Sequence, residues 1–292
     1  MSLEAAKAIM EGYTKRANNE PWDWKQNDHL TQLAAQIDQL KQGFQTKDIF
    51  VRLSSRSPKD AAIGQRGVGI YKEAKKKIVA LATELNDTLS TEDNTKLHAL
   101  YVTGTEALRI QNGEQAIDLF LSSARIQDDL RQYTLHPNQD FNVVVREFAN
   151  FEVELEFRGF VYAKKLTAIT QYNQFCYFPR VVKNKEYLHK VMKQFIEEEL
   201  VQKVSLNNFV IDIILISDST DQPYSNLKVY IVEINPFAEF AGEGLFSWTD
   251  PHEVAILKGR SPFEFRVVEK PPKDAIKLID KEWRTFVEAD KD

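Results

Sequence analysis

The chain has 292 residues, of which 43% are hydrophobic and 28% are charged, and its formal net charge is -5. These values are typical of a soluble globular protein with one large domain or two lobes. The net negative charge argues against a general DNA or RNA binder. The single cysteine, Cys176, excludes an intrachain disulfide and a cysteine-based zinc site. Because no run of about eighteen apolar residues and no signal-peptide core occurs, we expect a cytoplasmic protein without a membrane span.

Residues 1–48 are predicted to form helices that cover a core. Apolar residues recur at helical spacing over 3–17 and again over 29–44, with a proline and tryptophans between the two runs. No side chain in this segment suggests chemistry. A second segment, 49–140, and a third, 141–292, carry the candidate functional residues.

The second segment begins with a short apolar strand that leads into a basic loop. Donor groups crowd this loop, namely Arg52, Ser54, Ser55, Arg56, Ser57 and Lys59. Guanidinium, hydroxyl and ammonium groups together suit phosphate oxygens, although a solvated basic turn explains the same pattern equally well. The GQRGVG run that follows lacks the order of a nucleotide-binding fingerprint. Helical patterns at 70–90, 91–110 and 113–133 complete the segment.

From about residue 140 onward the composition shifts from helical to extended. Alternating apolar and polar residues predict a strand over 141–148 and a hairpin turned at Ala163–Lys164–Lys165, and an amphipathic helix follows at 185–203. Arg158 lies between two phenylalanines of this hairpin. A surface arginine there is common, but an arginine on an inner strand needs an anion. We expect irregular chain over 246–259, then a short extended run and a helical C-terminus.

The strongest chemical signal comes from two apolar runs, 208–216 and 227–237, which are joined by a polar turn and predict neighbouring strands. Glu233 and Asn235 share one face because side chains alternate along a strand, and pairing can place Asp212 beside them. Three oxygen-bearing side chains then converge on one point.

Two facing carboxylates in a strand core repel one another unless a positive group lies between them. Mg2+ is the usual cation for sites of carboxylate and amide oxygens, and it also binds phosphate. Pro236 and Phe237 favour such a site because they end the strand directly after the proposed ligands. Two half-exposed strands whose acids face water are equally compatible with the pattern alone.

Seven short motifs follow one another in the chain: SPKDA at 57–61, SSARIQDDL at 122–130, VVREF at 144–148, ELEFRGFV at 154–161, LTAITQ at 166–171, FVIDI at 209–213 and VYIVEINPFAEFAGEGLFSW at 229–248. In this order they resemble the cell division cycle protein 123 family over roughly residues 50 to 250. That family has an ATP-grasp fold, binds ATP and magnesium, and is implicated in assembling the eukaryotic translation initiation factor 2 complex. The resemblance therefore implies a chaperone-like protein with ATP, Mg2+ and a protein partner.

The resemblance also implies roles for individual residues. Asp212, Glu233 and Asn235 fall on the family's magnesium-binding positions. For the nucleotide it implies Arg52, Lys59 and Arg158 near the phosphates, Arg146, Glu147 and Phe148 on the hinge strand that holds adenine, and Gln171 facing the same cleft. The chain departs from the family in three places: VRLSSR replaces a PKLNWS-like segment, about thirty extra residues separate the first two motifs, and the region before residue 49 does not resemble the family.

Two functions are compatible with these residues. In the first, ATP and Mg2+ hold two lobes together and create a surface for a protein partner such as initiation factor 2. In the second, the chain is an ATP-grasp ligase or phosphotransferase whose unidentified acceptor binds among the helices inserted at 64–118. A purely structural α+β protein is the third interpretation. None of the three interpretations assigns catalytic residues.

The predicted fold class is α+β. The resemblance makes it ATP-grasp-like, with a helical and basic-loop N-terminal lobe, a C-terminal antiparallel-sheet lobe and the nucleotide in the crevice.

Overall fold

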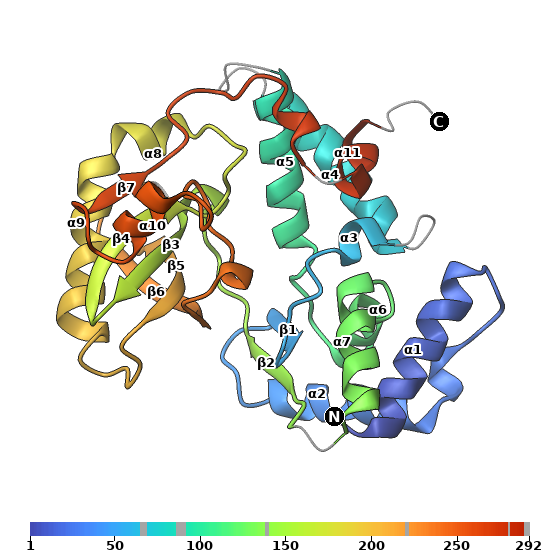
Figure 1. Cartoon of the computed structure of the whole chain (residues 1–292). Helices are drawn as coiled ribbons and strands as arrows, with labels where there is room; N and C mark the ends of the chain where they lie inside the picture. Colours follow the sequence, from blue (N-terminus) through green and yellow to red (C-terminus); the bar gives the residue numbers. More distant parts are fainter. Residues whose placement is uncertain (65–68, 86–91, 138–139, 220–221, 280, 289–292) are drawn as a thin grey trace. The chain divides into compact units, whose positions relative to one another are not determined.

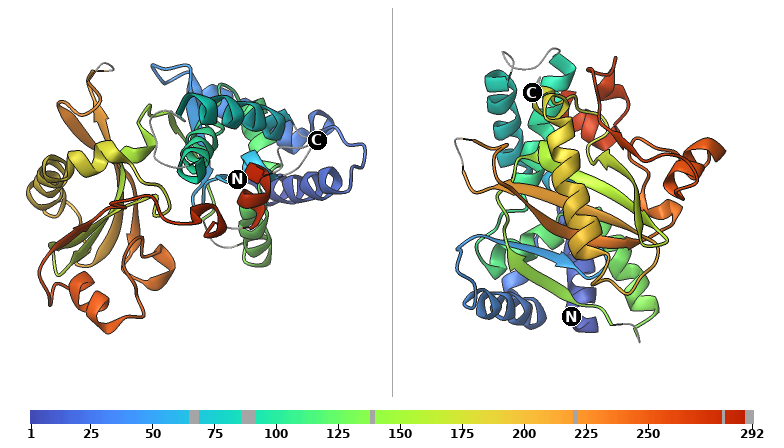
Figure 2. Two further views of the ribbon diagram at one scale, coloured as in Figure 1. Left: turned by 90° about the horizontal axis from the view of Figure 1, so that it is seen from above. Right: turned by 90° about the vertical axis from the view of Figure 1, so that its left-hand side faces the viewer.

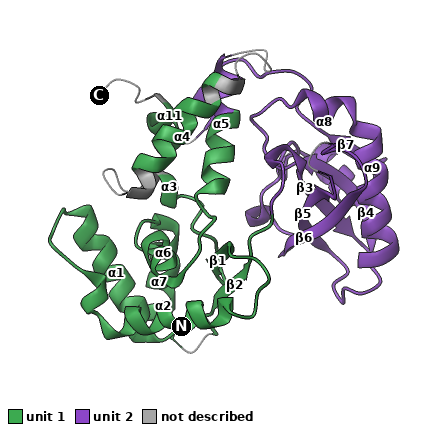
Figure 3. Ribbon diagram, turned by 180° about the vertical axis from the view of Figure 1, so that it is seen from behind, with its two compact units in different colours: residues 1–85, 98–149, 280–292 green, residues 86–97, 150–279 purple. Residues whose placement is uncertain are grey.

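A computed structural model of the protein describes residues 1–64, 69–85, 92–137, 140–219, 222–279 and 281–288. The chain divides into two compact units (Figure 3). Unit 1 comprises residues 1–85, 98–149 and 280–292, and unit 2 comprises residues 86–97 and 150–279. Helix α5 (Glu92–Glu106) therefore contributes residues to both units. Each unit is described by itself.

The first two helices of unit 1 confirm the helical prediction for this segment. α1 (Leu3–Ala17) begins after Ser2, and α2 (Asp28–Lys41) begins after Asn27. Both side chains accept hydrogen bonds from backbone amides of the first helical turn, which have no partner within the helix. The 3-10 turn η1 (Trp24–Gln26) lies between the helices, and apolar side chains of both helices join one core cluster.

The other helices described in unit 1 are α3 (Ala61–Gly64), α4 (Gly69–Leu85), the second part of α5, α6 (Gly113–Phe120), α7 (Ala124–Leu135) and α11 (Lys281–Glu288). Residues 86–90 of the predicted helix at 70–90 lie outside the described residues. The single helix predicted at 113–133 is wrong. The Ser122 hydroxyl donates to the Asp118 carbonyl, and the Ser123 hydroxyl accepts from the Ile126 amide. These local bonds end α6 and cap α7, so the pattern contains two helices.

A two-stranded antiparallel ribbon in unit 1 joins β1 (Ile49–Leu53) to β2 (Val143–Glu147) and confirms both predicted strands. Alternate residues of β1 are buried in the helical core. The other two residues of β1, Phe50 and Arg52, share the opposite face with Arg146, which pairs with Phe50 in the register.

Unit 2 is built on a five-stranded sheet in the order β6-β5-β3-β4-β7 (Figure 1). Its strands are β3 (Glu156–Tyr162), β4 (Lys165–Gln171), β5 (Phe209–Ser217), β6 (Leu227–Pro236) and β7 (Glu264–Arg266). Neighbours are antiparallel except β4 and β7, which are parallel. The predicted hairpin is confirmed: β3 and β4 are joined at Ala163 and Lys164, whose φ angles of 50° and 64° are those of a type I′ turn.

One face of this sheet is covered by the helices that follow β4, as the left view of Figure 2 shows. α8 (Pro179–Lys183) and α9 (Lys185–Gln194) lead into a π-helical turn, η3 (Phe195–Leu200). A Cβ at Gly159 would contact η3, so this strand position needs a small residue. The amphipathic helix predicted at 185–203 is confirmed as far as residue 200, and its last turn is the π-helix η3.

The opposite face, which carries Phe160, is covered by α10 (Pro251–Leu257) and the chain that precedes it. The irregular chain predicted over 246–259 is therefore wrong in part. Asp250 caps the first turn of α10 through its carboxylate, and Pro251 occupies a position where a missing amide hydrogen costs nothing.

Helices and a largely antiparallel sheet confirm the α+β class, whereas the ATP-grasp arrangement with a nucleotide crevice stays a prediction. The 3-10 turns of unit 2 are η2 (Val153–Leu155), η4 (Glu239–Ala241) and η5 (Ala275–Lys277). None of the helices in the described ranges combines the length and apolar character that crossing a membrane requires.

Candidate functional site

The centre of the candidate site is an ion pair between two adjacent strands of unit 2. Arg158 on β3 is directly opposite Asp212 on β5. The Nε atom of Arg158 donates to Oδ1 of Asp212 at 2.7 Å, and its Nη2 atom donates to Oδ2 at 2.8 Å. The arginine and aspartate side chains are 11% and 1% exposed. This bidentate pair is therefore shielded from water. Its charges interact more strongly in the protein interior than they would in solvent.

Glu233 and Asn235 on β6 lie beside this pair. Glu233 is opposite Asp212 in the register, and Asn235 is opposite Val210. The Asn235 amide makes a long hydrogen bond of 3.5 Å to Oδ2 of Asp212. The three oxygen-bearing side chains thus converge as the strand pattern predicts, and their role as metal ligands stays a prediction.

The pKa of Arg158 reflects these neighbours. Burial, the strongest influence, lowers the pKa of the guanidinium, but hydrogen bonds to Asp212 and electrostatic interactions with Asp212, Tyr172 and Glu233 together raise it above its ordinary value. The guanidinium therefore stays charged at every physiological pH.

Each member of the ion pair compensates the charge of the other. The strand pattern requires a positive group near Asp212, and an inner-strand arginine requires an anion near Arg158; the fold provides both within one contact. Removing one partner of such a buried pair typically costs about 3–5 kcal/mol because the other charge is left uncompensated. The charge of Asp212 alone therefore does not demand a metal.

A cavity of about 550 Å³ adjoins the ion pair, a volume typical of small-molecule sites. It is lined by Arg158, Tyr172, Gln174, Glu239, Gly242, Glu243, Gly244, Trp248 and Thr249. The Arg158 guanidinium lies 5.2 Å from the centre of the Tyr172 ring. The buried Nε1 of Trp248 has no hydrogen-bond partner within the described residues.

Two glycines let the loop after β6 approach the ion pair closely. Gly242 has a φ angle of 80°, and a Cβ there would collide with Nη1 of Arg158. Gly244 has a φ angle of 62°, and a Cβ there would collide with Thr170. The carbonyl of Ala241 in the same loop accepts a hydrogen bond from Nη1 of Arg158. Arg158 therefore joins Asp212 to this loop, and only glycine fits the space that remains.

Gln171, which the resemblance implies at the cleft, is buried at the end of β4. Its Nε2 atom donates to the carbonyls of Asn173 and Cys176 at 2.5 and 2.7 Å, and its Oε1 atom accepts from the amide of Val268 at 3.2 Å. Both donors are used within the fold, so its side chain can offer a ligand only the remaining acceptor capacity of Oε1.

The other residues implied for the nucleotide lie in unit 1. Arg52 donates from Nε to the Leu53 carbonyl at 3.0 Å and from Nη2 to the Ser55 carbonyl at 3.1 Å. The Arg146 guanidinium lies 5.2 Å from the centre of the Phe50 ring. Because Arg52 and Arg146 share one face of the β1–β2 ribbon, the structure brings these two cations together.

The end of β2 and the basic loop hold the remaining three residues. Oε1 of Glu147 accepts from the amide of Gln45 at 2.7 Å, and the Arg109 guanidinium lies 4.6 Å from the centre of the Phe148 ring. Lys59 is half-buried in the turn that follows β1. These residues belong to a different unit from the ion pair, and their roles stay predictions.

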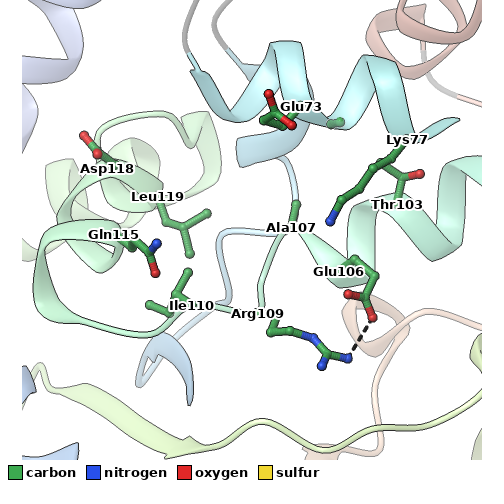
Figure 4. Close-up of a pocket in the computed structure, with 11 residues that line it drawn as sticks. Glu73, Lys77, Thr103, Glu106, Ala107, Arg109, Ile110, Gln115, Asp118 and Leu119 are labelled. Atoms are coloured by element: carbon green, nitrogen blue, oxygen red, sulfur yellow. Dashed lines mark hydrogen bonds and ion pairs between the residues drawn. The ribbon is translucent and has the colours of Figure 1, made fainter. Parts of the chain in front are cut away.

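A second cavity, of about 350 Å³, lies in unit 1 among the helices inserted at 64–118 (Figure 4). Its apolar lining comes from Ala74, Ala107, Ile110 and Leu119. Among its charged residues, Glu106 pairs with Arg109 at 2.9 Å, and Lys77 extends towards the cavity from α4. The ligase hypothesis expects an acceptor site in this part of the chain.

Sequence reasoning missed the aromatic and acidic lining of the larger cavity. Tyr172 and Trp248 are ordinary aromatic residues in the sequence, and only the fold shows that they face the site. A usable signal was the Gly242-Glu243-Gly244 run directly after the proposed ligand strand, since paired glycines mark a close backbone approach.

Comparisons with known proteins agree on one family. Residues 70–285 match the family described as D123. A "Translation initiation factor eIF2 assembly protein" from Vanderwaltozyma polyspora is 27% identical over 139 residues, covering 46% of this chain and 35% of that protein. A protein of the same name from Emericella nidulans is 31% identical over 126 residues, covering 43% of this chain and 28% of that protein. The chain thus matches about a third of the length of these curated relatives.

The structure of Cdc123 from Schizosaccharomyces pombe has a similar fold. The TM-score is 0.56 at 18% sequence identity, and the superposition covers 90% of this chain and 86% of that chain. At this identity the similarity concerns the fold alone.

Proposed function

Because the chain belongs to the D123 family, we propose that it assists the assembly of the translation initiation factor eIF2 and binds ATP together with Mg2+ in unit 2. Family membership rests on the match over residues 70–285 and confirms the resemblance inferred from the seven motifs. The names of the curated relatives support eIF2 as the partner.

The observation that carries the nucleotide proposal is the group formed by Arg158, Asp212 and Asn235 beside a glycine-lined cavity. Carboxylate and amide oxygens from adjacent strands are the donors that Mg2+ prefers, and the guanidinium suits phosphate oxygens. Within the described ranges no three His, Cys, Asp or Glu side chains form a metal cluster, so the proposed set depends on the asparagine oxygen. The residues present fit a metal–nucleotide complex.

Charge supports the binding of ATP as its metal complex. Glu239 and Glu243 line the cavity, and Glu233 is near enough to Arg158 to influence its pKa. A free triphosphate would meet these carboxylates with one arginine that is already paired. A bound Mg2+ would neutralise part of the phosphate charge and join it to the acidic ligands.

In this proposal Asp212, Glu233 and Asn235 hold the cation, and Arg158 shares its donors between Asp212 and a phosphate oxygen. The roles that the resemblance implies for five residues of unit 1 stay predictions, namely those for Arg52, Lys59, Arg146, Glu147 and Phe148. Gln171 acts through the backbone that it holds in place.

Calorimetric titration of ATP, with and without Mg2+, tests the nucleotide site. The parent chain is expected to bind at least about tenfold more tightly with Mg2+, and Asp212→Asn to lose about 10–100-fold, as metal-site substitutions do. Asp218→Asn, an exposed aspartate paired with Lys228 in the same unit, is the matched control and should equal the parent. If Asp212→Asn binds as tightly as the parent, the assignment of Asp212 as a metal ligand is wrong. If the parent binds no ATP, the proposed nucleotide site is wrong.

Direct binding of purified eIF2 subunits to the immobilised chain tests the partner independently. Measurable affinity is expected, and its absence under conditions where the chain is folded would contradict the assembly role while leaving the nucleotide site intact.

The second candidate, an ATP-dependent ligase or phosphotransferase, is favoured by the separate cavity among the inserted helices. A ligase or phosphotransferase should release ADP continuously, and Lys77→Met should slow this release. An assembly factor that only binds ATP should release no more than one equivalent of ADP. Lys72→Met, on the same helix but outside the cavity lining, is the matched control.

A further inference from the structure

A row of polar side chains crosses the five strands of unit 2 on the face of the sheet that carries Phe160. In the strand register each member of the row lies opposite the next: Glu233, Asp212, Arg158, Thr170 and Arg266. Directly opposed residues of neighbouring strands share a face of the sheet. The first three members belong to the candidate site, whereas the last two continue the row onto β4 and β7.

The loop after β6 crosses this row, and its residues 242–244 line the cavity beside Arg158. This stretch is called the cavity wall below. Directly before it, the Ala241 carbonyl accepts a hydrogen bond from Nη1 of Arg158. Arg158 therefore holds one end of the cavity wall.

Leu245, directly after the cavity wall, is held by the two outer members of the row. Its amide donates to Oγ1 of Thr170 at 3.1 Å, and its carbonyl accepts from Nη1 of Arg266 at 3.0 Å. Both backbone groups of Leu245 are thereby used, so this residue cannot turn without breaking a hydrogen bond. The second end of the cavity wall thus depends on Arg266 as well as on Thr170.

Arg266 is itself held by two glutamates and one aromatic ring. Its Nε atom donates to Oε2 of Glu264 at 2.7 Å, and its Nη2 atom donates to Oε1 of Glu253 at 3.1 Å. The guanidinium lies 4.1 Å from the centre of the Phe246 ring. A planar guanidinium can donate in several directions while it stacks on a ring, which the ammonium group of lysine cannot do. Contacts with β7, α10 and the loop therefore direct Nη1 towards Leu245.

We infer that Arg266 is a positioning residue for the binding of ATP with Mg2+. It lies outside the cavity lining that the described residues form, so it acts through Leu245 on the cavity wall. Side chains that support a site from behind hold its contacts in place and influence affinity without touching the ligand. The inference rests on the proposed binding of ATP with Mg2+ and is independent of the protein partner.

Calorimetric titration of the full chain with ATP and Mg2+ tests this role. Arg266→Lys keeps the positive charge but loses the planar guanidinium, so binding should weaken about tenfold, the low end for residues that support a metal site. Arg180→Lys is the matched control, because Arg180 also pairs with two glutamates of unit 2 and lies over an aromatic ring. These partners lie outside the loop, namely Glu152, Glu154 and Tyr224. Since distant sites act independently, Arg180→Lys should bind within about twofold of the parent.

Fluorine NMR of the chain labelled with fluorinated tryptophan measures whether the cavity wall moves. The chain has four tryptophans, and Trp248→Phe identifies the resonance of Trp248, which lines the cavity. Arg266→Lys should shift this resonance and leave unchanged those of Trp22, Trp24 and Trp283, which belong to unit 1. A general loss of stability would not shift one resonance of the folded state alone.

Glu253→Gln is the second variant, and it decides the role if Arg266→Lys does not fold. It keeps the shape of the partner but removes its charge, while the bonds of Arg266 to Glu264 and Leu245 remain. Binding of ATP with Mg2+ should weaken about threefold, the lower end of what one hydrogen bond contributes. The shift of the Trp248 resonance should be smaller than in Arg266→Lys.

The outcomes separate this inference from the proposed nucleotide site. Weaker binding and a shifted Trp248 resonance together support the positioning role of Arg266, and either change alone contradicts it. Equal weakening by Arg180→Lys also contradicts it, and in each of these cases the nucleotide site stands. If the parent binds no ATP, the nucleotide site is wrong, and the role of Arg266 in binding is wrong with it.

Discussion

A ligand that disrupts the Arg158–Asp212 pair must compensate the free energy that the pair contributes to the folded state. Each buried charge satisfies the other, so a ligand must replace whatever it takes away. Under the proposed function, free nucleotide would offer an anion to Arg158 but leave Asp212 uncompensated, whereas a metal–nucleotide complex would supply a cation and an anion at once. We therefore expect the site to select the complex over free nucleotide.

Asp212→Ala should lower the free energy of unfolding by about 3–5 kcal/mol, because Arg158 is left buried without its counter-charge. Chemical denaturation with urea measures this. The double variant Arg158→Met/Asp212→Leu should recover more than half of the loss, since neither charge remains. A cost below about 1 kcal/mol for Asp212→Ala would mean that water reaches the pair.

Glu154 should make stability depend on pH. Burial is the main cause of its raised pKa and outweighs the opposing effects of Arg180 and Tyr224. The folded state therefore holds the proton more tightly than the unfolded state, and stability falls as pH rises from the ordinary value of 4.5 to the raised one, then levels off. Glu154→Gln should lose this decline in urea midpoints measured at successive pH values. Parallel curves for parent and variant would contradict the assignment.

At the scale of elements, the loop between β6 and α10 is shaped by backbone conformations that only glycine adopts easily. Gly242 has φ and ψ angles of 80° and 152°, a region that other residues avoid. Its missing side chain gives Arg158 the space to bond the loop carbonyl. The loop is therefore part of the ion-pair site although it contributes no charge to the pair.

Gly242→Ala should cost about 1–3 kcal/mol and weaken binding of ATP with Mg2+, because backbone strain and the collision with Arg158 act together. Gly43→Ala is the control, since a Cβ there has its nearest contact at an ordinary 3.5 Å. It should change stability by less than about 0.5 kcal/mol. Thermal unfolding measures the stability of both variants, and calorimetry measures their binding of ATP with Mg2+. If the two variants have the same stability and affinity, the loop has adapted to the extra methyl group of Gly242→Ala.

At the scale of the whole molecule, a ligand that binds only the folded state stabilises it by mass action. ATP with Mg2+ at one hundred times its dissociation constant should raise the free energy of unfolding by about 2.7 kcal/mol. Because the chain has two compact units, two transitions can occur, and the one that includes unit 2 should shift. ATP alone should give a smaller shift because it binds more weakly without the metal, and Mg2+ alone should shift neither transition. An equal shift with ATP alone would show that the phosphate contacts need no cation.

Local patterns accounted for most elements. The alternation at 49–53 and 141–148, the hairpin turn at Ala163–Lys164, and the helical spacing in α1, α2 and α9 depend on neighbouring residues in the sequence, so periodicity reveals them. Two features were missed: the break between α6 and α7 at Ser122–Ser123, and helix α10. Hydrogen bonds of single capping side chains determine where these helices begin, and the spacing of apolar residues does not reveal such caps.

The sequence by itself determined the family, the α+β class and the two strands that bring Asp212, Glu233 and Asn235 together, since order of motifs and a period of two are properties of the chain. Only the tertiary structure decided that Arg158 is the counter-charge of Asp212 and that Tyr172 and Trp248 line a cavity beside them. The physical reason is that charge compensation and burial depend on distances between residues far apart in the chain, which strand order and register fix only in the folded state.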